Sequence, residues 1–393
     1  MKRTIRDIDV TNKRVFVRVD YNVPINTDLK IVDDERIVAT LPTINYLIEH
    51  NAKVILCSHL GRPNGQKDTK VSLRPVLSRL SKLLYRPVSF AEDVMADSTK
   101  EMIDKMHEGD VLMLENIRFY PEEEKNNADF ASHLASLADI YVFEAFATAH
   151  RKHASTYGIA KLLPNAIGFL VEHELEMFDK IMKNPTHPFV AILGGAKVSD
   201  KLPVVENLLN VADTILIGGG MSYTFVKAIG GAVGNSIVDN SKIDLAKEIL
   251  DKAKEKGVKV ILPIDNIGAK EFSEDAESKR FMSGFFDEAY QGMDIGPKTI
   301  KMFKKAIKKA KTIVWNGPLG VYEYDRFRKG TNKIAKYVAK SKAVSMIGGG
   351  DSIAAVQNLG YRKRITHLST GGGASLTLLQ GKKLPCVEVI QNV

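Results

Sequence analysis

The first half of the chain carries arginines and histidines at points where short apolar, β-branched runs end. These residues are His59, Arg62, Arg118, His150 and Arg151, and Arg36 lies in the same half of the chain. A guanidinium group can bind two oxygens of a phosphate or a carboxylate at once. Asp20 and Asn22, in VRVDYNVP, add acceptors suited to a hydroxyl group. Together these residue types predict a cationic cup for a small ligand that carries phosphate, carboxyl and hydroxyl groups.

In the second half, the apolar runs end in glycines instead. The positions are Gly194 and Gly195, Gly218 to Gly220, Gly317, Gly348 to Gly350, and Gly371 to Gly373. Glycine lets the backbone approach a ligand closely, and a helix that begins after such a loop directs its free N–H groups at an anion. One glycine loop can be only a tight turn, but five in one half indicate a glycine shelf that holds a di- or triphosphate.

Charged residues beside these glycines suggest how a nucleotide would be held. Lys197 and Lys201, in GGAKVSDK, would share one face of a helix and could both reach phosphates at its N-terminus. In GGGDS, Asp351 could serve Mg²⁺ carried in with a nucleotide, although Asp351 or Ser352 could equally be an ordinary helix N-cap. Glu323, after WNGPLGVY, could accept hydrogen bonds from ribose hydroxyls.

The phosphate-binding motifs of three large enzyme classes are absent from the chain. It contains no GxxxxGK[ST], no HRD and DFG pair, and no GxGxxG fingerprint followed by an acidic residue. P-loop enzymes and protein kinases are therefore excluded, and the missing fingerprint argues against a Rossmann dehydrogenase.

Strands and helices in alternation must position these residues. The expected strands of the first half are RVFVRVD, AKVILCSHLG, DVLMLENIRF and DIYVFEAF, and those of the second half are PFVAILGGAK, ADTILIGGG, VKVILPID, KTIVWNGP, AVSMIGGGD and ITHLSTGGG. Helical patterns between them predict βαβ units and parallel sheets, which bind ligands at the carboxyl ends of their strands. In GFLVEHELEMFDKIMKNP, Val171, Leu175, Phe178 and Met182 share one helical face, and Pro185 ends the pattern. This segment predicts a helix that connects two domains, with the boundary near residue 170.

Length and composition agree with a two-domain globular enzyme. The 393 residues exceed the size of a single core, and the net charge of +9 suggests an anionic partner. The basic run KKAIKKAK is interpreted as the solvated face of a helix. Cys57 and Cys386 lack any metal-ligand or redox spacing and are expected to be buried thiols. Without an apolar leader or membrane-length run, a cytoplasmic location with no membrane association is expected.

The chain resembles the phosphoglycerate kinases from about residue 10 to about residue 380. The matching segments are VRVDYNVP, SHLGRP, LENIRF, AHRKHAS, GGAKVSDK, GGGMSYTF, WNGPLGVYE, IGGGDS and STGGGAS, in the family's order. The resemblance implies an α/β fold of two doubly wound parallel-sheet (Rossmann-like) domains joined by a hinge helix. Residues 1–170, with a C-terminal tail of about 378–393, would bind 3-phosphoglycerate, and residues 171–377 would bind the nucleotide.

The implied activity is reversible, Mg²⁺-dependent phosphoryl transfer between 1,3-bisphosphoglycerate plus ADP and 3-phosphoglycerate plus ATP, by a monomer. By position, the substrate-binding residues would be Asp20, Asn22, Arg36, His59, Arg62, Arg118 and Arg151. The nucleotide-binding residues would be Lys201, Gly219, Gly220, Gly292, Asn316, Glu323, Gly349, Gly350, Asp351 and Ser352. The residues around the transferred group would be Arg36, Lys197, Lys201, Gly371 and Gly372, and the metal ligand would be Asp351. Such a reaction needs in-line positioning and positive charge, so closure of the two lobes is expected to bring Arg36 and Lys201 to the phosphoryl group.

One segment departs from the family pattern, which reads NDAFGTAHR. This chain has FEAFATAHR, so Phe143, Glu144 and Ala147 replace Asn, Asp and Gly. Alanine would be strained if the backbone there required a positive φ. Ser352 stands where the family usually has threonine, which keeps the hydroxyl group. Two other functions remain as alternatives: an inactive nucleotide- or anion-binding protein of the same fold, and an additional role in binding nucleic acid, which no recognition motif supports.

Overall fold

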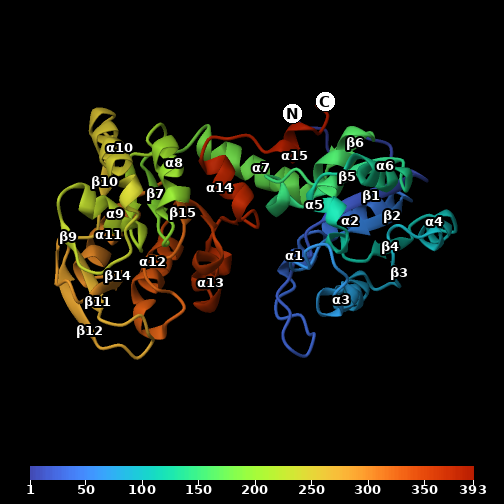
Figure 1. Cartoon of the computed structure of the whole chain (residues 1–393). Coiled ribbons are helices and arrows are strands. Elements are labelled where there is room, and N and C mark those ends of the chain that lie inside the picture. Colours follow the sequence, from blue (N-terminus) through green and yellow to red (C-terminus); the bar gives the residue numbers. More distant parts are fainter. The chain divides into compact units, whose positions relative to one another are not determined.

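The computed structural model describes residues 1–393 and divides the chain into two compact units. Unit 1 is Met1–Glu176 with Lys383–Val393, and unit 2 is Met177–Lys382. Both ends of the chain lie in unit 1 (Figure 1), where Lys2 and Asn392 form a β-bridge. The helix α7 (Phe169–Met182) crosses the boundary between the units.

A six-stranded parallel sheet with the order β3-β4-β2-β1-β5-β6 forms the centre of unit 1. Its strands are β1 (Arg14–Val19), β2 (Lys53–Cys57), β3 (Ser89–Ala91), β4 (Val111–Leu114), β5 (Ile140–Glu144) and β6 (Asn165–Ile167). The central strands are buried almost throughout, which explains why they read as continuous apolar runs. The two edge strands have three residues each and were not predicted from the sequence.

Helices flank this sheet (Figure 1). They are α1 (Glu35–Val38), α2 (Leu41–Glu49), α3 (Arg74–Leu84), α4 (Asp97–Asp104), α5 (Pro121–Glu124), α6 (Ala128–Ser136) and α15 (Pro385–Glu388). Apolar residues at helical spacing, such as Val76, Leu80 and Leu84 of α3, face the core that the strands build.

Unit 2 contains a second six-stranded parallel sheet, with the order β10-β8-β7-β15-β16-β17. Its strands are β7 (Phe189–Leu193), β8 (Thr214–Ile217), β10 (Lys259–Ile261), β15 (Thr312–Asn316), β16 (Val344–Gly348) and β17 (His367–Leu368). Its helices are α8 (Val198–Leu208), α9 (Met221–Ala228), α10 (Ile243–Glu255), α11 (Pro297–Lys309), α12 (Lys329–Lys340), α13 (Gly350–Asn358) and α14 (Gly373–Leu379). The expected fold class, with two parallel sheets in a Rossmann-like arrangement, is confirmed.

Unit 2 also contains strands that the sequence did not predict. They are β9 (Ala232–Val233), β11 (Asp265–Ala269), β12 (Ser278–Met282), β13 (Phe285–Phe286) and β14 (Gln291–Ile295). The strands β12, β11 and β14 form an antiparallel sheet, while β9 and β13 form a two-stranded ribbon. Most side chains of β12 are exposed, so no apolar alternation marks it in the sequence.

The basic run on α11 and the two cysteines are as expected. The lysines between Lys304 and Lys309 are exposed, whereas Phe303 and Ile307 are buried. Cys57 and Cys386 are free, buried thiols, and burial raises the pKa of each to about 12. None of the helices combines the length and the apolar composition that crossing a bilayer requires.

Candidate active site

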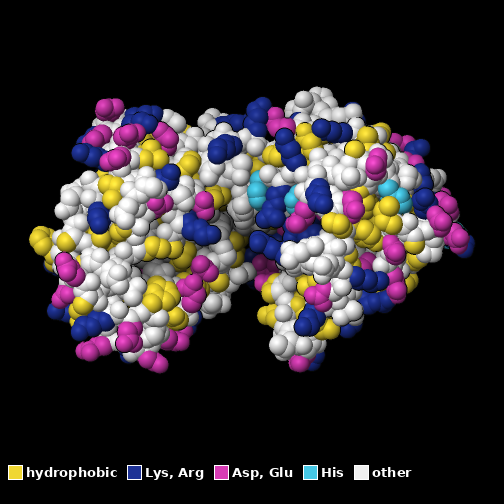
Figure 2. All heavy atoms as spheres, viewed as in Figure 1, with side chains coloured by type: hydrophobic (Ala, Val, Ile, Leu, Met, Phe, Trp, Pro, Cys, Tyr) yellow, Lys and Arg dark blue, Asp and Glu magenta, His cyan; other side chains and the backbone are white.

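The cationic cup lies at the carboxyl edge of the unit 1 sheet. Asp20 directly follows β1, and His59 lies two residues after the end of β2. Arg118 follows β4, and Arg151 follows β5 after a short turn. Because β4, β2, β1 and β5 are neighbours, the sheet brings these four residues to one edge. Figure 2 shows Lys, Arg and His side chains gathered on one part of the surface of unit 1.

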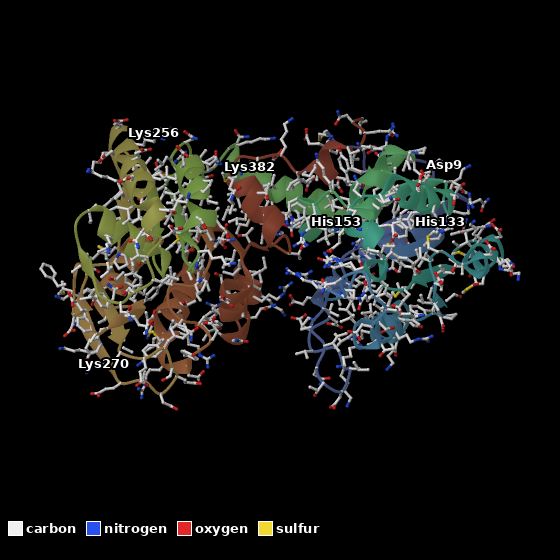
Figure 3. The ribbon with its side chains drawn as sticks, in the orientation of Figure 1. Asp9, His133, His153, Lys256, Lys270 and Lys382 are labelled. Carbon is white, nitrogen blue, oxygen red and sulfur yellow. The ribbon has the colours of Figure 1, made fainter.

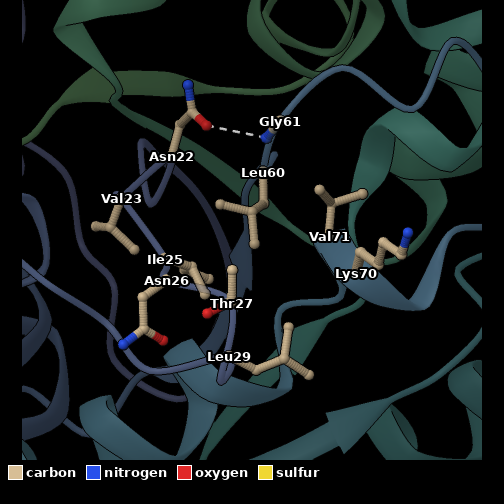
Figure 4. A pocket seen from close by; sticks show the side chains of 10 residues that line it. All are labelled: Asn22, Val23, Ile25, Asn26, Thr27, Leu29, Leu60, Gly61, Lys70 and Val71. Atoms are coloured by element: carbon tan, nitrogen blue, oxygen red, sulfur yellow. Dashed lines mark hydrogen bonds between the residues drawn. The ribbon is translucent and has the colours of Figure 1, made fainter.

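Hydrogen bonds and an ion pair connect the residues around Asp20. The Asp20 carboxylate forms an ion pair with Arg36 on α1 and accepts a hydrogen bond from the backbone N–H of Asn22 at 3.1 Å. The Asn22 Oδ1 atom in turn accepts from the backbone N–H of Gly61 at 2.9 Å, as Figure 4 shows. The loops after β1 and β2 are thereby tied together, and Arg36 is held at the rim.

A cavity of about 500 Å³ adjoins the cup at Asn22 and Gly61 (Figure 4). Its lining combines the apolar residues Val23, Ile25, Leu29, Leu60 and Val71 with the polar residues Asn26, Thr27 and Lys70. The arginine cluster meets this lining where Arg118 donates to the carbonyl of Gly61.

Arg118 and Arg62 occupy contrasting environments in the cup. Arg118 is only 4% exposed, donates to the carbonyl of Gly61 at 2.9 Å and pairs with Glu124 at 3.2 Å between Nε and Oε1. Burial lowers its pKa to about 10, so it stays protonated at neutral pH. Arg62 is exposed, which leaves its guanidinium group open to a ligand.

The C-terminal tail contacts the backbone of the loop that carries Arg151. The carbonyl of Arg151 accepts a hydrogen bond from the Cys386 Sγ at 3.0 Å, and the backbone N–H of Cys386 donates to the carbonyl of Ala149 at 3.1 Å. The Arg151 side chain is half-buried and donates from Nε to the Nε2 atom of His150 at 3.2 Å. The tail therefore fixes the loop that carries this arginine.

The variant segment FEAFATAHR is accommodated without backbone strain. Ala147 lies within a 3₁₀ turn, Phe146–Thr148, and is not among the residues with positive φ. The concern that alanine would be strained here was wrong, because the turn is right-handed. Phe143 is fully buried in β5 and simply adds to the core.

Glu144 caps the start of α7. Its buried carboxylate accepts hydrogen bonds from the backbone N–H groups of Leu170 at 3.0 Å and Val171 at 3.2 Å, and from the hydroxyl of Thr43. These N–H groups have no partner within the helix, so an acceptor at this end stabilises it. Burial nevertheless raises the pKa of Glu144 to about 7, against the effect of these hydrogen bonds.

A buried polar network beneath the cup was missed in the sequence. Arg18 on β1 is completely buried, donates to the Ser155 Oγ at 2.7 Å, and has its Nη2 4.0 Å from the Glu123 carboxylate. The Ser155 N–H and hydroxyl donate to Glu123 at 2.8 and 2.6 Å. His153 (Figure 3) lies 3.8 Å from Glu123, and burial together with the nearby arginines lowers its pKa to about 3. The available signal was one arginine inside the apolar run RVFVRV, since a buried strand rarely carries an isolated charge.

The glycine shelf lies at the carboxyl edge of the unit 2 sheet. The strands β8 and β7 are neighbours, and β15 separates β7 from β16. Each of β8, β7 and β16 leads through a glycine loop into a helix, namely α9, α8 and α13. Gly219 and Gly349 have φ angles of 63° and 89°, a left-handed conformation that favours glycine. The N-termini of three helices therefore meet at one edge, which is a favourable place for phosphates.

Lys201 lies on α8 and is directed at the end of β15. Its ammonium group donates to the side-chain oxygen of Asn316 and lies 3.5 Å from the carbonyl oxygen of the same residue. Burial lowers the pKa of Lys201 to about 8. Lys197 is exposed and is the N-cap residue of α8, with extended backbone. The expectation that both lysines are helical was therefore wrong, since only Lys201 lies within the helix.

Asp351 and Ser352 occupy the first turn of α13, but neither is its N-cap. That position belongs to Gly349, with no side-chain cap, so the N-cap alternative was wrong. The Ser352 Oγ instead accepts a hydrogen bond from the backbone N–H of Gly317 at 2.9 Å, which joins the loop after β15 to α13. Asp351 lies at the surface. Desolvation of its carboxylate, followed by the nearby Glu323 carboxylate, raises its pKa.

The remaining site candidates of unit 2 are glycines in four places. Gly220 is the N-cap of α9, Gly350 begins α13, Gly371 and Gly372 form the turn before α14, and Gly292 lies in β14. At Gly292 a Cβ atom would collide with the side chain of Tyr223, so no larger residue fits without rearrangement.

Comparison with known proteins identifies the family. The family model of phosphoglycerate kinase matches residues 5–382. The chain belongs to the phosphoglycerate kinase family. It is therefore a kinase of the class that uses a carboxyl group as phosphoryl acceptor, and its glycolytic role follows from the same membership.

Individual relatives cover the whole chain. The phosphoglycerate kinase of Clostridium tetani is 50% identical over 394 residues, covering 100% of this chain and 98% of the relative. That of Pseudothermotoga lettingae is 52% identical over 392 residues, covering 100% and 99%. Among solved structures, phosphoglycerate kinase from Coxiella burnetii has a TM-score of 0.88 at 40% identity and covers 99% of this chain and 98% of its own. The enzyme from Pyrococcus horikoshii has a TM-score of 0.81 at 36% identity, with 98% of both chains covered.

Proposed function

We propose that the cationic cup binds 3-phosphoglycerate, that the glycine shelf binds ATP or ADP, and that the phosphoryl group moves in line between them. This assignment rests on one observation: the two sheet edges present different kinds of anion-binding groups. One edge presents the arginines described above, and the other presents three helix N-termini with Lys201. A phosphorylated carboxylic acid suits the first set, and a polyphosphate suits the second.

Mg²⁺ would be held mainly through the nucleotide. No group of three or more histidine, cysteine or acidic side chains that could hold a metal ion occurs in the structure. Asp351, with Glu323 close enough to raise its pKa, offers a carboxylate at the helix start, and Mg²⁺ typically takes one or two carboxylates plus phosphate oxygens. These residues fit the ion, which would neutralise phosphate charge during transfer.

The protein groups act by position and charge. An acyl phosphate is already an activated donor, so ATP formation requires no general base. Arg36, held by Asp20 in unit 1, and Lys201, held by Asn316 in unit 2, would stabilise the transferring phosphoryl group. We propose that closure of the two units about α7 brings the substrates together and excludes water, and that the enzyme works as a cytoplasmic monomer.

Calorimetric titration tests whether unit 1 binds 3-phosphoglycerate and unit 2 binds the nucleotide. Arg118→Met is expected to lose 3-phosphoglycerate binding and to retain binding of Mg-ADP. Asp351→Asn is expected to weaken Mg-ADP binding and to retain binding of 3-phosphoglycerate. Loss of the same ligand in both variants would refute the assignment.

A further inference from the structure

Arg18 is a fully buried cation whose three donor nitrogens all have acceptors nearby. Its Nε donates to the Ser155 Oγ at 2.7 Å, and its Nη1 donates to the carbonyl of Val19 at 2.5 Å. Its Nη2 lies 3.3 Å from the Nδ1 atom of His59. Burying a guanidinium group costs free energy unless the group is paired. An aliphatic side chain at this strand position would avoid that cost.

The contact with His59 determines which ring nitrogen carries the proton. A guanidinium group offers only donors and does not lose its proton in proteins, so the Nδ1 atom of His59 must be the acceptor. The nearest carboxylate, that of Asp20, lies 3.9 Å from Nδ1, beyond hydrogen-bond distance. The proton of a neutral His59 is therefore on Nε2, and no residue of the protein accepts it.

The charges around His59 also keep the ring neutral. They are the arginines Arg18, Arg36, Arg118 and Arg151, which come from several elements of unit 1, whereas the Asp20 carboxylate, 3.9 Å from Nδ1, acts in the opposite direction. Burial, followed by the four arginines, lowers the pKa of His59 well below 6.5. At neutral pH the ring is thus a neutral donor at the edge of an anion-binding cup.

We propose that Arg18 is a positioning residue that fixes His59 as the Nε2–H tautomer, so that Nε2–H donates to an anionic oxygen of the substrate. The proposal rests on the role in substrate binding proposed above for His59. Without the Arg18 donor, the opposite tautomer becomes accessible, and its unprotonated Nε2 would repel the same oxygen. Arg18 would thereby set substrate affinity without touching the substrate.

The tautomer can be observed directly, without any substrate. In protein labelled with ¹⁵N-histidine, the ring signals of His59 are assigned by their loss in His59→Gln. We expect a protonated Nε2, an unprotonated Nδ1 and no titration as the pH passes through the ordinary histidine pKa of 6.5. In Arg18→Met the pKa of His59 should rise toward its ordinary value of 6.5, because one cation has been removed, and the Nδ1–H form should appear.

Two further variants separate this role from a structural one. Arg18→Met/Glu123→Gln avoids leaving the Glu123 carboxylate buried beside a lost partner. Arg14→Met is the matched control: Arg14 lies four residues earlier on β1 and on the same face, but pairs with Asp139 at 2.8 Å. The control should leave the His59 signals and the KM for 3-phosphoglycerate unchanged within about twofold.

Kinetics then test the link to His59. The KM for 3-phosphoglycerate should rise on the order of tenfold in the double variant, with the KM for ATP unchanged. In a His59→Gln background, the same pair of substitutions should change the KM less than about twofold. An unchanged tautomer in the double variant, or an equal KM increase in the His59→Gln background, would overturn the proposal. If the wild type lacked phosphoglycerate kinase activity, the proposed function would fail, while the tautomer measurement would still give its own result.

Discussion

Lys201 is the cation of the glycine shelf whose charge depends most on its surroundings. Burial lowers its pKa to about 8, so the free enzyme should lose the ammonium charge as the pH rises through that value. We expect kcat/KM for the nucleotide to fall above about pH 8, because only the charged form attracts phosphates. Lys201→Arg keeps its charge at every accessible pH and should lack this alkaline limb, even though its turnover is lower. An identical limb in both enzymes would mean that another group is titrating.

Glu144 makes a prediction about stability. The pKa of Glu144 in the folded state is about 7, above its ordinary value of 4.5. Its contribution to the free energy of unfolding is therefore complete below about pH 4.5 and is lost as the pH rises through about 7. Relative to Glu144→Gln, which does not ionise, the wild type should lose on the order of 3 kcal/mol between pH 4.5 and pH 8. Urea unfolding of both proteins across this range measures the difference. A constant difference would show that folding does not raise the pKa of Glu144.

The sequence located the residues that follow strands better than those within them. Arg118 was singled out because it follows an apolar run, and Lys201 because it lies in the helix expected after a glycine loop. Arg18 could not be given a role, since the acceptor on Ser155 lies 137 residues away in the chain. Glu144 was a similar case: the sequence marked it only as a departure from the family pattern, whereas the structure shows a cap for a helix that begins 25 residues later.

At the scale of elements, the Ser352 hydroxyl is the link between the loop after β15 and α13. Removing it leaves the buried N–H of Gly317 without its acceptor, which typically costs about 1–3 kcal/mol. Ser352→Ala should therefore raise the KM for ATP severalfold and leave that for 3-phosphoglycerate unchanged. Ser352→Thr keeps the hydroxyl and should behave like the wild type. Equal effects of the two substitutions on the KM for ATP would contradict this role.

The elements themselves were predictable to different degrees. Ten of the twelve strands of the two parallel sheets were recognised from the sequence, and the central ones were recognised because buried parallel strands are uniformly apolar. The antiparallel sheet formed by β11, β12 and β14 was not predicted, because most side chains of β12 are exposed and its sequence shows no apolar alternation. This sheet carries Gly292, which only the family resemblance identified as a candidate.

At the scale of the whole molecule, the two half-sites belong to separate compact units that share α7. The proposed closure predicts that 3-phosphoglycerate and a nucleotide together reduce the radius of gyration more than either ligand alone. Small-angle X-ray scattering of the full chain measures this change. Scattering curves that superimpose with and without both ligands would exclude closure as the gating step.

The central claim is that Arg36 and the glycine shelf serve a single phosphoryl transfer. The most direct test is a coupled assay of 3-phosphoglycerate phosphorylation by Mg-ATP, comparing the wild type with Arg36→Ala. We expect turnover by the wild type and a loss on the order of 10³-fold in the variant, as for an arginine that stabilises the transition state. A loss below about tenfold would remove Arg36 from the transfer step. No turnover by the wild type would contradict the account as a whole.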